Sequence, residues 1–350
     1  MSDKKKILIV DDSKMIRKGL AGIFEASTSF EVVGEAADGN EALAAIKKLQ
    51  PDVVTLDVVM PEMDGLTTLK HIMIECPRPT VMLSSLTQDG TETTFDALRY
   101  GAVDFISKPS RLEEQSMDDL AEDILNKLNI AEGIDVGVTS YIRTHAGNSA
   151  TSEPLEGKCK KLVALGAAEG GYRALMKIIP HLVPTDAAYL VVLYAEESHV
   201  DAFAAYLDQH SKVAVKCAQH DEVLQAGVCY LSVGSDYMSV HEQGDDLVLH
   251  VSPAPFASRK GSIDRLLFSV AEIMDENSVG VVLSGAGIDG SEGLEEIERL
   301  HGVTIVQEPK SCLAQEMSKS ALNLCSPDYI ISDIDIPTTI NELLGIDGKK

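Results

Sequence analysis

Short apolar runs, each followed by an amphipathic segment, constrain this chain more than any other feature, and the first series of them spans residues 5–110. Its apolar runs cover residues 5–10, 31–36, 53–57, 80–85 and 104–108. Between them, apolar side chains recur at helical spacing, for example in residues 14–26 and 40–49. Strands that are apolar throughout are typical of a parallel sheet covered by helices on both faces. The first series therefore predicts a doubly wound, flavodoxin-like (βα)5 domain.

Polar side chains stand where four of these five predicted strands end. Asp11 and Asp12 follow the first strand, Asp57 ends the third, Ser84 lies at the end of the fourth and Lys108 ends the fifth. In such sheets ligands bind beyond the carboxyl ends of the strands. The three carboxylates would repel each other unless a cation lay between them, and oxygen ligands favour Mg²⁺. With the ion held there, Asp57 can attack a phosphoryl group while Lys108 and Ser84 neutralise its oxygens.

A second alternating series begins at about residue 161. Its apolar runs cover residues 162–167, 189–195, 213–218, 279–284 and 303–307, and helical spacing returns in residues 172–181, 201–210, 263–274 and 292–300. Three β-rich runs between residues 227 and 252 predict an antiparallel hairpin insert. Residues 117–130 fit a fifth helix of the first domain, whereas residues 131–160 have the composition of a linker. We expect a first domain at 1–130, a linker at 131–160 and a larger α/β domain at 161–350.

Charge and cysteine spacing exclude several classes of protein. The formal net charge is −25, which disfavours nucleic acid as a partner because binding to phosphates depends on Lys and Arg. The six cysteines are scattered without metal-ligand spacing, and no apolar signal segment precedes the first strand. No apolar run approaches the roughly 20 residues of a membrane span. We therefore expect a soluble, cytoplasmic protein without membrane insertion.

The first 110 residues closely resemble the receiver domains of two-component response regulators at the strand-end positions named above. The resemblance implies that a histidine kinase phosphorylates Asp57 and that Mg²⁺ is the cofactor. It also assigns Ser84 and Phe105 to the switch that reports phosphorylation.

Residues 161 to about 345 resemble the catalytic domain of CheB-type chemoreceptor glutamate methylesterases. The resemblance lies in GAAEGG at residues 166–171, SIDRLLFSVA at 262–271 and LSGAGIDG at 283–290, with support from GVCYL at 227–231 and TIVQ at 304–307. The order of receiver, linker and output domain also matches. The resemblance implies a methylesterase-like fold, and the cytoplasmic part of a chemoreceptor as the ancestral partner.

The catalytic residues that this resemblance implies are mostly replaced. The family uses a serine nucleophile, a histidine base and an orienting aspartate, of which only the aspartate has a counterpart, Asp289. Ala168 stands at the serine position, Glu169 follows it in place of threonine, and Ala195 stands at the histidine position. A methyl group can neither attack an ester nor accept a proton. The amide expected to stabilise the oxyanion lies near Ala286, where the family has methionine.

Ser198 and His199 could in principle form a relocated nucleophile and base. Adjacent residues rarely face each other for proton transfer, however, and Ser198 fits a helix N-cap more simply. We therefore favour the cap.

The loops that follow the strands of the second domain are rich in carboxylates. Glu169, Glu196, Glu197 and Asp289 could together bind a divalent cation or a basic peptide. Solvated glutamates of an acidic domain explain them more simply, because no histidine or cysteine completes a ligand set.

The sequence therefore predicts a phosphorylation-regulated signalling protein whose output domain acts by binding a partner, either a chemoreceptor or another signalling protein. Two alternatives stay open. One is an active methylesterase or deamidase with relocated catalytic residues. The other is a phosphate sink, in which the receiver drains phosphoryl groups from a kinase and the output domain is only structural.

Overall fold

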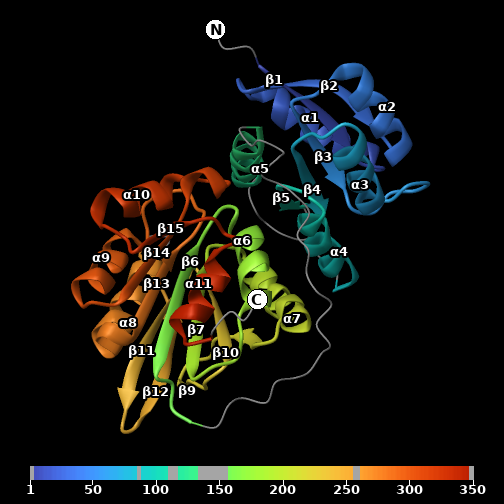
Figure 1. Cartoon of the computed structure of the whole chain (residues 1–350). Helices are drawn as coiled ribbons and strands as arrows, with labels where there is room; N and C mark the ends of the chain where they lie inside the picture. Colours follow the sequence, from blue (N-terminus) through green and yellow to red (C-terminus); the bar gives the residue numbers. More distant parts are fainter. Residues whose placement is uncertain (1–3, 85–87, 109–116, 133–156, 255–260, 347–350) are drawn as a thin grey trace. The chain divides into compact units, whose positions relative to one another are not determined.

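A computed structural model describes residues 4–84, 88–108, 117–132, 157–254 and 261–346 of the chain (Figure 1). The chain divides into two compact units, Met1–Arg143 and Thr144–Lys350. Each unit has its own sheet and is described by itself. Among the described helices, none is long and apolar enough to cross a membrane.

The first unit is a parallel sheet with helices on both faces. In its described residues the strand order is β2-β1-β3-β4-β5, and all neighbouring strands pair in parallel. The strands are β1 Lys5–Val10, β2 Phe30–Ala36, β3 Val53–Asp57, β4 Thr80–Ser84 and β5 Asp104–Ser107. The helices are α1 Lys14–Ala26, α2 Gly39–Leu49, α3 Gly65–Glu75, α4 Gln88–Arg99 and α5 Met117–Glu132. The predicted (βα)5 fold is confirmed.

Gly65 allows the first turn of α3 to approach the end of β3. Its amide donates a hydrogen bond to the Val58 carbonyl at 3.0 Å. A Cβ atom on Gly65 would lie only 1.9 Å from the carbonyl oxygen of Asp57. Glycine is therefore required at this position, and the close approach fixes the backbone around Asp57.

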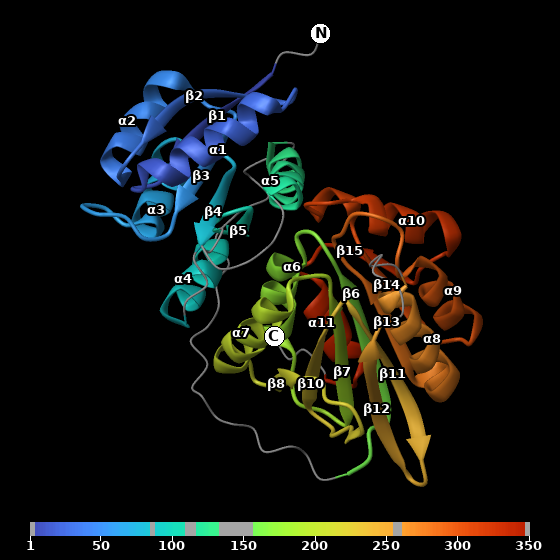
Figure 2. The same cartoon turned by 180° about the vertical axis from the view of Figure 1, so that it is seen from behind.

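The second unit contains a larger parallel sheet. Its strand order, over the residues described, is β15-β14-β13-β6-β7-β10-β8. The strands are β6 Lys161–Ala167, β7 Ala187–Leu193, β8 Ala214–Cys217, β10 Val228–Val233, β13 Ser278–Val282, β14 Val303–Gln307 and β15 Tyr329–Ile331. The helices are α6 Gly171–Ile178, α7 Glu197–His210, α8 Ser262–Met274, α9 Ser291–Arg299, α10 Glu316–Leu324 and α11 Ile336–Leu343. Helices α8, α9 and α10 cover one face, and α6, α7 and α11 cover the other (Figures 1 and 2).

A separate antiparallel sheet of order β11-β12-β9 packs against α8. It consists of β9 Glu222–Val223, β11 Asp236–Gln243 and β12 Asp246–Pro253. The hairpin insert is thus confirmed, but the prediction that all three β-rich runs belong to it is wrong. The first of these runs, β10, lies between β7 and β8 in the parallel sheet, where its side chains are buried on both faces.

Two predicted element ends near the second site are also wrong. Strand β7 ends at Leu193, so Ala195 lies in the following loop. Helix α7 begins at Glu197 and has Glu196 as its N-cap residue, so Ser198 lies inside the helix and is not the cap. The side chain of Ser198 is outside the described residues.

A buried ion pair joins α6 to the segment before α11. Lys177 Nζ lies 2.8 Å from Asp333 Oδ2, and the two side chains are 10% and 6% exposed. Asp333 also acts electrostatically on Arg173, a buried side chain of the same helix, and burial lowers the pKa of Arg173 to about 10. The Asp333 carboxylate therefore acts on two buried cations of α6.

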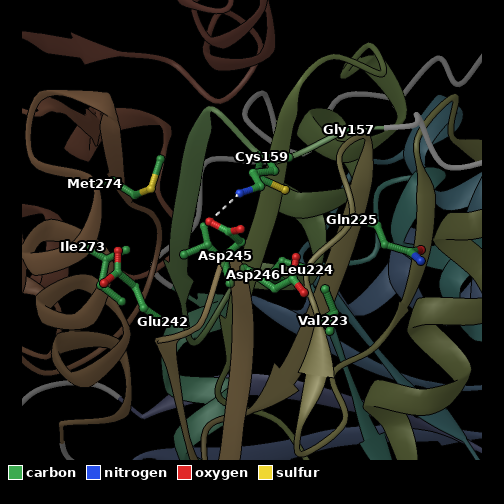
Figure 3. Close-up of a pocket in the computed structure, with 12 residues that line it drawn as sticks. Gly157, Cys159, Val223, Leu224, Gln225, Glu242, Asp245, Asp246, Ile273 and Met274 are labelled. Atoms are coloured by element: carbon green, nitrogen blue, oxygen red, sulfur yellow. Dashed lines mark ion pairs between the residues drawn. The ribbon is translucent and has the colours of Figure 1, made fainter.

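The hollow drawn in Figure 3 lies at the opposite end of the second unit from the predicted site. It has a volume of about 600 Å³ and is lined by residues that precede β6 and β10 and by the end of α8, including Cys159, Leu224 and Met274. Lys158 crosses it to pair with Asp245 at 3.1 Å. Because ligands of parallel sheets bind at the carboxyl ends of the strands, this hollow at the amino ends is not the candidate site.

Asp333→Asn should lower the free energy of unfolding by about 3–5 kcal/mol, because the buried Lys177 would lose the carboxylate that pairs with it at 2.8 Å. Asp186→Asn is the matched control. It removes a pair of similar length, Lys160 to Asp186 at 2.9 Å, whose side chains are exposed, and should cost at most about 1 kcal/mol. Urea unfolding followed by circular dichroism measures both variants, and equal losses would contradict the assignment.

Candidate functional site

The carboxyl end of the first sheet brings the predicted phosphorylation residues together. Lys108 Nζ lies 2.7 Å from Asp11 Oδ2 and 2.6 Å from Asp57 Oδ2. Asp11 and Asp57 are buried, whereas Asp12 is exposed. Carboxylate oxygens of these three aspartates lie within 4.8 Å of one another. An all-oxygen group of this size fits a hard divalent cation such as Mg²⁺.

The electrostatics of this group centre on Asp57. Burial raises the pKa of Asp57 above its ordinary value, and the neighbouring Asp11 carboxylate adds to the rise. Lys108 opposes both effects through its hydrogen bond and its charge. Two buried carboxylates thus share one lysine. A bound cation would stabilise the charged form of Asp57 further.

Arg17 is a site residue that the sequence reasoning missed. Its guanidinium donates hydrogen bonds to the backbone carbonyls of Asp11 at 2.6 Å and Asp12 at 3.2 Å, and pairs with Glu35 at 2.9 Å. It therefore fixes the turn that carries both aspartates. Its position in the first turn of an amphipathic helix gave no sign of this role.

The predicted switch residues both contact α4. The Ser84 hydroxyl hydrogen-bonds to the Thr94 hydroxyl at 2.8 Å, and both side chains are buried. Phe105 is also buried and packs edge-to-face on Phe95, with ring centroids 5.9 Å apart. A change in the side-chain position of Ser84 or Phe105 would therefore alter the contacts of that residue with α4.

In the second unit, Asp289 is fully engaged by the fold. Its carboxylate accepts hydrogen bonds from the amides of Ile263 at 3.0 Å and Asp264 at 2.9 Å, at the start of α8. The Tyr194 hydroxyl donates a third, at 2.5 Å. Asp289 is only 7% exposed. Ala195 stands at the expected histidine position. Asp289, which would orient a histidine there, is instead bound to the preceding residue, Tyr194.

Tyr194 could not be recognised from the sequence. Burial raises the pKa of its hydroxyl, and the bond to the Asp289 carboxylate raises it further, so this hydroxyl stays protonated. Gly234 makes room for the ring, because a Cβ atom there would lie 2.0 Å from the Tyr194 side chain. A tyrosine at the end of a strand is common, and only the fold shows that it reaches Asp289.

The loop after β6 carries Ala168 and Glu169 to the loop after β13. The Ala168 amide donates to the Ser284 carbonyl at 2.9 Å, and Ala168 itself is 5% exposed. Glu169 Oε2 accepts a hydrogen bond from the Ala286 amide at 2.8 Å. The Ser284 hydroxyl fixes the same loop by donating to the Glu169 carbonyl at 2.6 Å. The amide expected to stabilise an oxyanion therefore already binds a carboxylate of the chain.

Glu169, Glu196 and Asp289, at the carboxyl ends of the strands, each interact with a different partner. Glu196 lies 3.5 Å from the ring of His199, a buried side chain in the first turn of α7. Within the described part of the chain, the groups of side chains close enough to share an ion do not include Glu169, Glu196, Glu197 and Asp289. Of the four carboxylates only Glu197 is exposed, whereas Glu169 and Asp289 accept hydrogen bonds from backbone amides.

Asp264 is the most strongly perturbed carboxyl group of this edge. Burial raises its pKa to about 7, and the nearby Asp289 carboxylate adds to the rise, while the Gly293 amide, which donates to Asp264 Oδ1 at 2.7 Å, opposes it. Asp264 therefore takes up a proton more readily than an ordinary aspartate does.

Comparison with known families matches both units. Residues 7–117 match the response regulator receiver domain, and residues 163–340 match CheB methylesterase. The chain is 36% identical over 345 residues to a protein-glutamate methylesterase/protein-glutamine glutaminase of Pyrococcus horikoshii, which covers 97% of this chain and 94% of the relative. A Nitrosomonas europaea protein of the same name is 34% identical over 352 residues, covering 99% and 98%.

Among solved structures, the catalytic domain of the Thermotoga maritima CheB methylesterase is similar to the second unit. It is 27% identical with a TM-score of 0.50, and the match covers 52% of this chain and 98% of that domain. The relatives match over both units and nearly their whole length. The chain therefore belongs to the CheB family of chemotaxis response regulators, which join a receiver domain to a methylesterase domain.

Proposed function

We propose that this CheB-family chain is phosphorylated on Asp57 by a histidine kinase and acts through its methylesterase-like domain by binding, without ester hydrolysis. The observation that carries the proposal is the state of the second site. Alanine occupies the nucleophile and base positions, and the two remaining polar groups, Asp289 and the Ala286 amide, are bound by the chain itself.

Phosphorylation follows from the residues at the carboxyl end of the first sheet. The Asp57 carboxylate attacks phosphorus, the N–P bond of the donor phosphohistidine breaks, and the histidine keeps the electron pair. Lys108 stabilises the equatorial oxygens, and the Ser84 hydroxyl can exchange Thr94 for a phosphoryl oxygen. Asp11, Asp12 and Asp57 would hold Mg²⁺, which when bound supplies positive charge to the transferring phosphoryl group.

Hydrolysis of an ester at the second site lacks its essential groups. Without a hydroxyl at residue 168 no acyl-enzyme can form, and residue 195 cannot take a proton. The Glu169 carboxylate would also repel an oxyanion from the Ala286 amide, to which it is itself bonded at 2.8 Å. Binding is what the domain retains, and the cytoplasmic part of a chemoreceptor, on which CheB relatives act, is the proposed partner.

An active methylesterase or glutaminase is the second candidate, favoured by the names of relatives such as the Pyrococcus horikoshii protein. It would need a nucleophile from elsewhere. The relocated pair considered above, Ser198 and His199, is a poor source, because adjacent residues of a helix do not face each other and His199 is buried. The phosphate sink differs from both, since chemotactic signalling would persist in it after deletion of residues 161–350.

Asp57→Asn should abolish labelling of the full chain by a radiolabelled small-molecule phosphodonor in the presence of Mg²⁺, because the nucleophile is removed. Asp52→Asn is the matched control. Asp52 lies at the other end of β3, is exposed and accepts a bond from the Lys6 amide, so its loss should leave labelling unchanged. Labelling of the Asp57 variant at the wild-type level would refute the assignment.

Methanol release from a methylated chemoreceptor fragment should be absent with the wild-type chain. The double variant Ala168→Ser, Ala195→His should still give little turnover. Glu169 would still bind the Ala286 amide, and Tyr194 would still bind Asp289. Adding Glu169→Thr and Tyr194→Phe to that double variant should raise the rate by about 100- to 1000-fold, the range in which oxyanion donors act. Wild-type turnover at an ordinary enzymatic rate would contradict the proposal.

A further inference from the structure

Three histidines that belong to neither site described above lie side by side on the sheet β11-β12-β9. His241 is on β11, His250 is on β12 and His220 lies in the turn two residues before β9. The ring of His250 lies 4.3 Å from that of His220 and 5.4 Å from that of His241, measured between centroids. All three are exposed. Three of the nine histidines of the chain thus form one row.

The register of the sheet explains the row. Ser239 pairs with His250, and His241 pairs with Val248, so these four side chains share one face. The other face packs against α8 in the core of the domain. The histidines therefore stand on the side of the sheet that faces away from that core, and Ser239 steadies the ring of His241 through a 3.0 Å contact with Nε2.

Asp221 adds a carboxylate to the row. In a regular strand, adjacent side chains point to opposite faces, but Asp221 has a φ of 59° and breaks this alternation. As a result, ligand atoms of His220, Asp221 and His250 all lie within 4.8 Å of one another. His220 Nε2 and Asp221 Oδ1 are 3.4 Å apart.

We propose that His220, Asp221 and His250 form a binding site for a divalent transition-metal ion such as Zn²⁺ or Ni²⁺. Two imidazoles and one carboxylate are a donor set that these ions prefer, in contrast to the all-oxygen group around Asp57. The remaining coordination positions would be taken by water or by His241, which adjoins His250. The ion would join the turn before β9 to β12.

Metal binding must displace one existing contact. The Val251 amide donates to His220 Nδ1 at 3.2 Å, which places the proton of the neutral ring on Nε2. If the metal binds Nε2, the proton moves to Nδ1 and the hydrogen bond from Val251 is lost. If the ring instead rotates by half a turn so that Nδ1 binds the metal, the same hydrogen bond is lost. That amide lies at an exposed contact, where water can replace the imidazole. The site therefore forms on binding.

The test is calorimetric titration of the full-length chain with Ni²⁺, in buffer containing saturating Mg²⁺ so that the aspartates around Asp57 are occupied. We expect one Ni²⁺ per chain, with release of protons and weaker binding at acidic pH, because ligating imidazoles must be unprotonated. His250→Gln and His220→Gln should each weaken binding at least about tenfold. His210→Gln is the matched control, since His210 stacks on Tyr206 of α7 outside the row.

Thermal unfolding provides a second readout that does not depend on calorimetric heats. Ni²⁺ should raise the unfolding temperature of the wild type and of His210→Gln, but not of His250→Gln, because only a folded row holds the ion. Circular dichroism of the metal-free variants checks that each one folds. Equal binding by His250→Gln and wild type would overturn the proposal, because cysteines or other ligands would then hold the ion. Absence of binding up to about 1 mM Ni²⁺ would overturn it as well.

Discussion

Parallel pairing places the last residue of every strand at one edge of its sheet, and both sites of this chain depend on that constraint. In the first unit it brings Asp11, Asp57 and Lys108 within 2.7 Å contacts although they are far apart in sequence. In the second unit it brings the loops after β6, β7 and β13 together. The same geometry gathers Asp11, Asp57 and Lys108 at the edge of the first sheet and Ala168, Tyr194 and Asp289 at the edge of the second.

Asp289 shows how a residue of a catalytic constellation can be retained for structural reasons. Its carboxylate accepts two amides at the N-terminus of α8, where a negative charge is favourable. Replacing it would leave those buried amides without an acceptor, which is costly whether or not the domain hydrolyses esters. The presence of this aspartate is therefore no argument for activity, and the Tyr194 hydroxyl bound to it removes the position that a histidine would need.

Glu169 has a comparable effect on the opposite side of the site. Its carboxylate accepts the hydrogen bond of the Ala286 amide. Glu169 and Tyr194 thus pair with the Ala286 amide and the Asp289 carboxylate within the chain. A partner that binds this edge must then be recognised by the surrounding surface, which includes the 68% exposed side chain of Ile288, and not by the catalytic amide.

Much of the fold could be predicted from the sequence, because buried parallel strands are apolar throughout and end in polar residues. The five strands of the first unit were located within one or two residues, and the group around Asp57 followed from their ends. Strands β9 and β15 were missed because two or three residues give no periodic signal. The run at β10 was assigned to the hairpin because turns flank it, although its residues are buried on both faces.

The contacts of single side chains could not be predicted in the same way. Nothing in the local sequence says that Tyr194 reaches Asp289, that Glu169 turns toward Ala286 or that Arg17 holds the carbonyls of Asp11 and Asp12. Each of these hydrogen bonds forms only when several helices and strands have packed and brought its two residues together. Ala168 and Ala195 could be singled out in the sequence, whereas the partners of Asp289 and of the Ala286 amide are seen only in the structure.

The most direct test of the account is to measure binding and turnover in one sample. The full-length chain, in molar excess over a methylated cytoplasmic chemoreceptor fragment, would be incubated with Mg²⁺ in the presence or absence of beryllofluoride as a phosphoryl mimic. Sedimentation would report the complex and gas chromatography the methanol. The account predicts a complex that strengthens with beryllofluoride, and no methanol beyond that from the fragment alone. Methanol release proportional to the complex formed would contradict it.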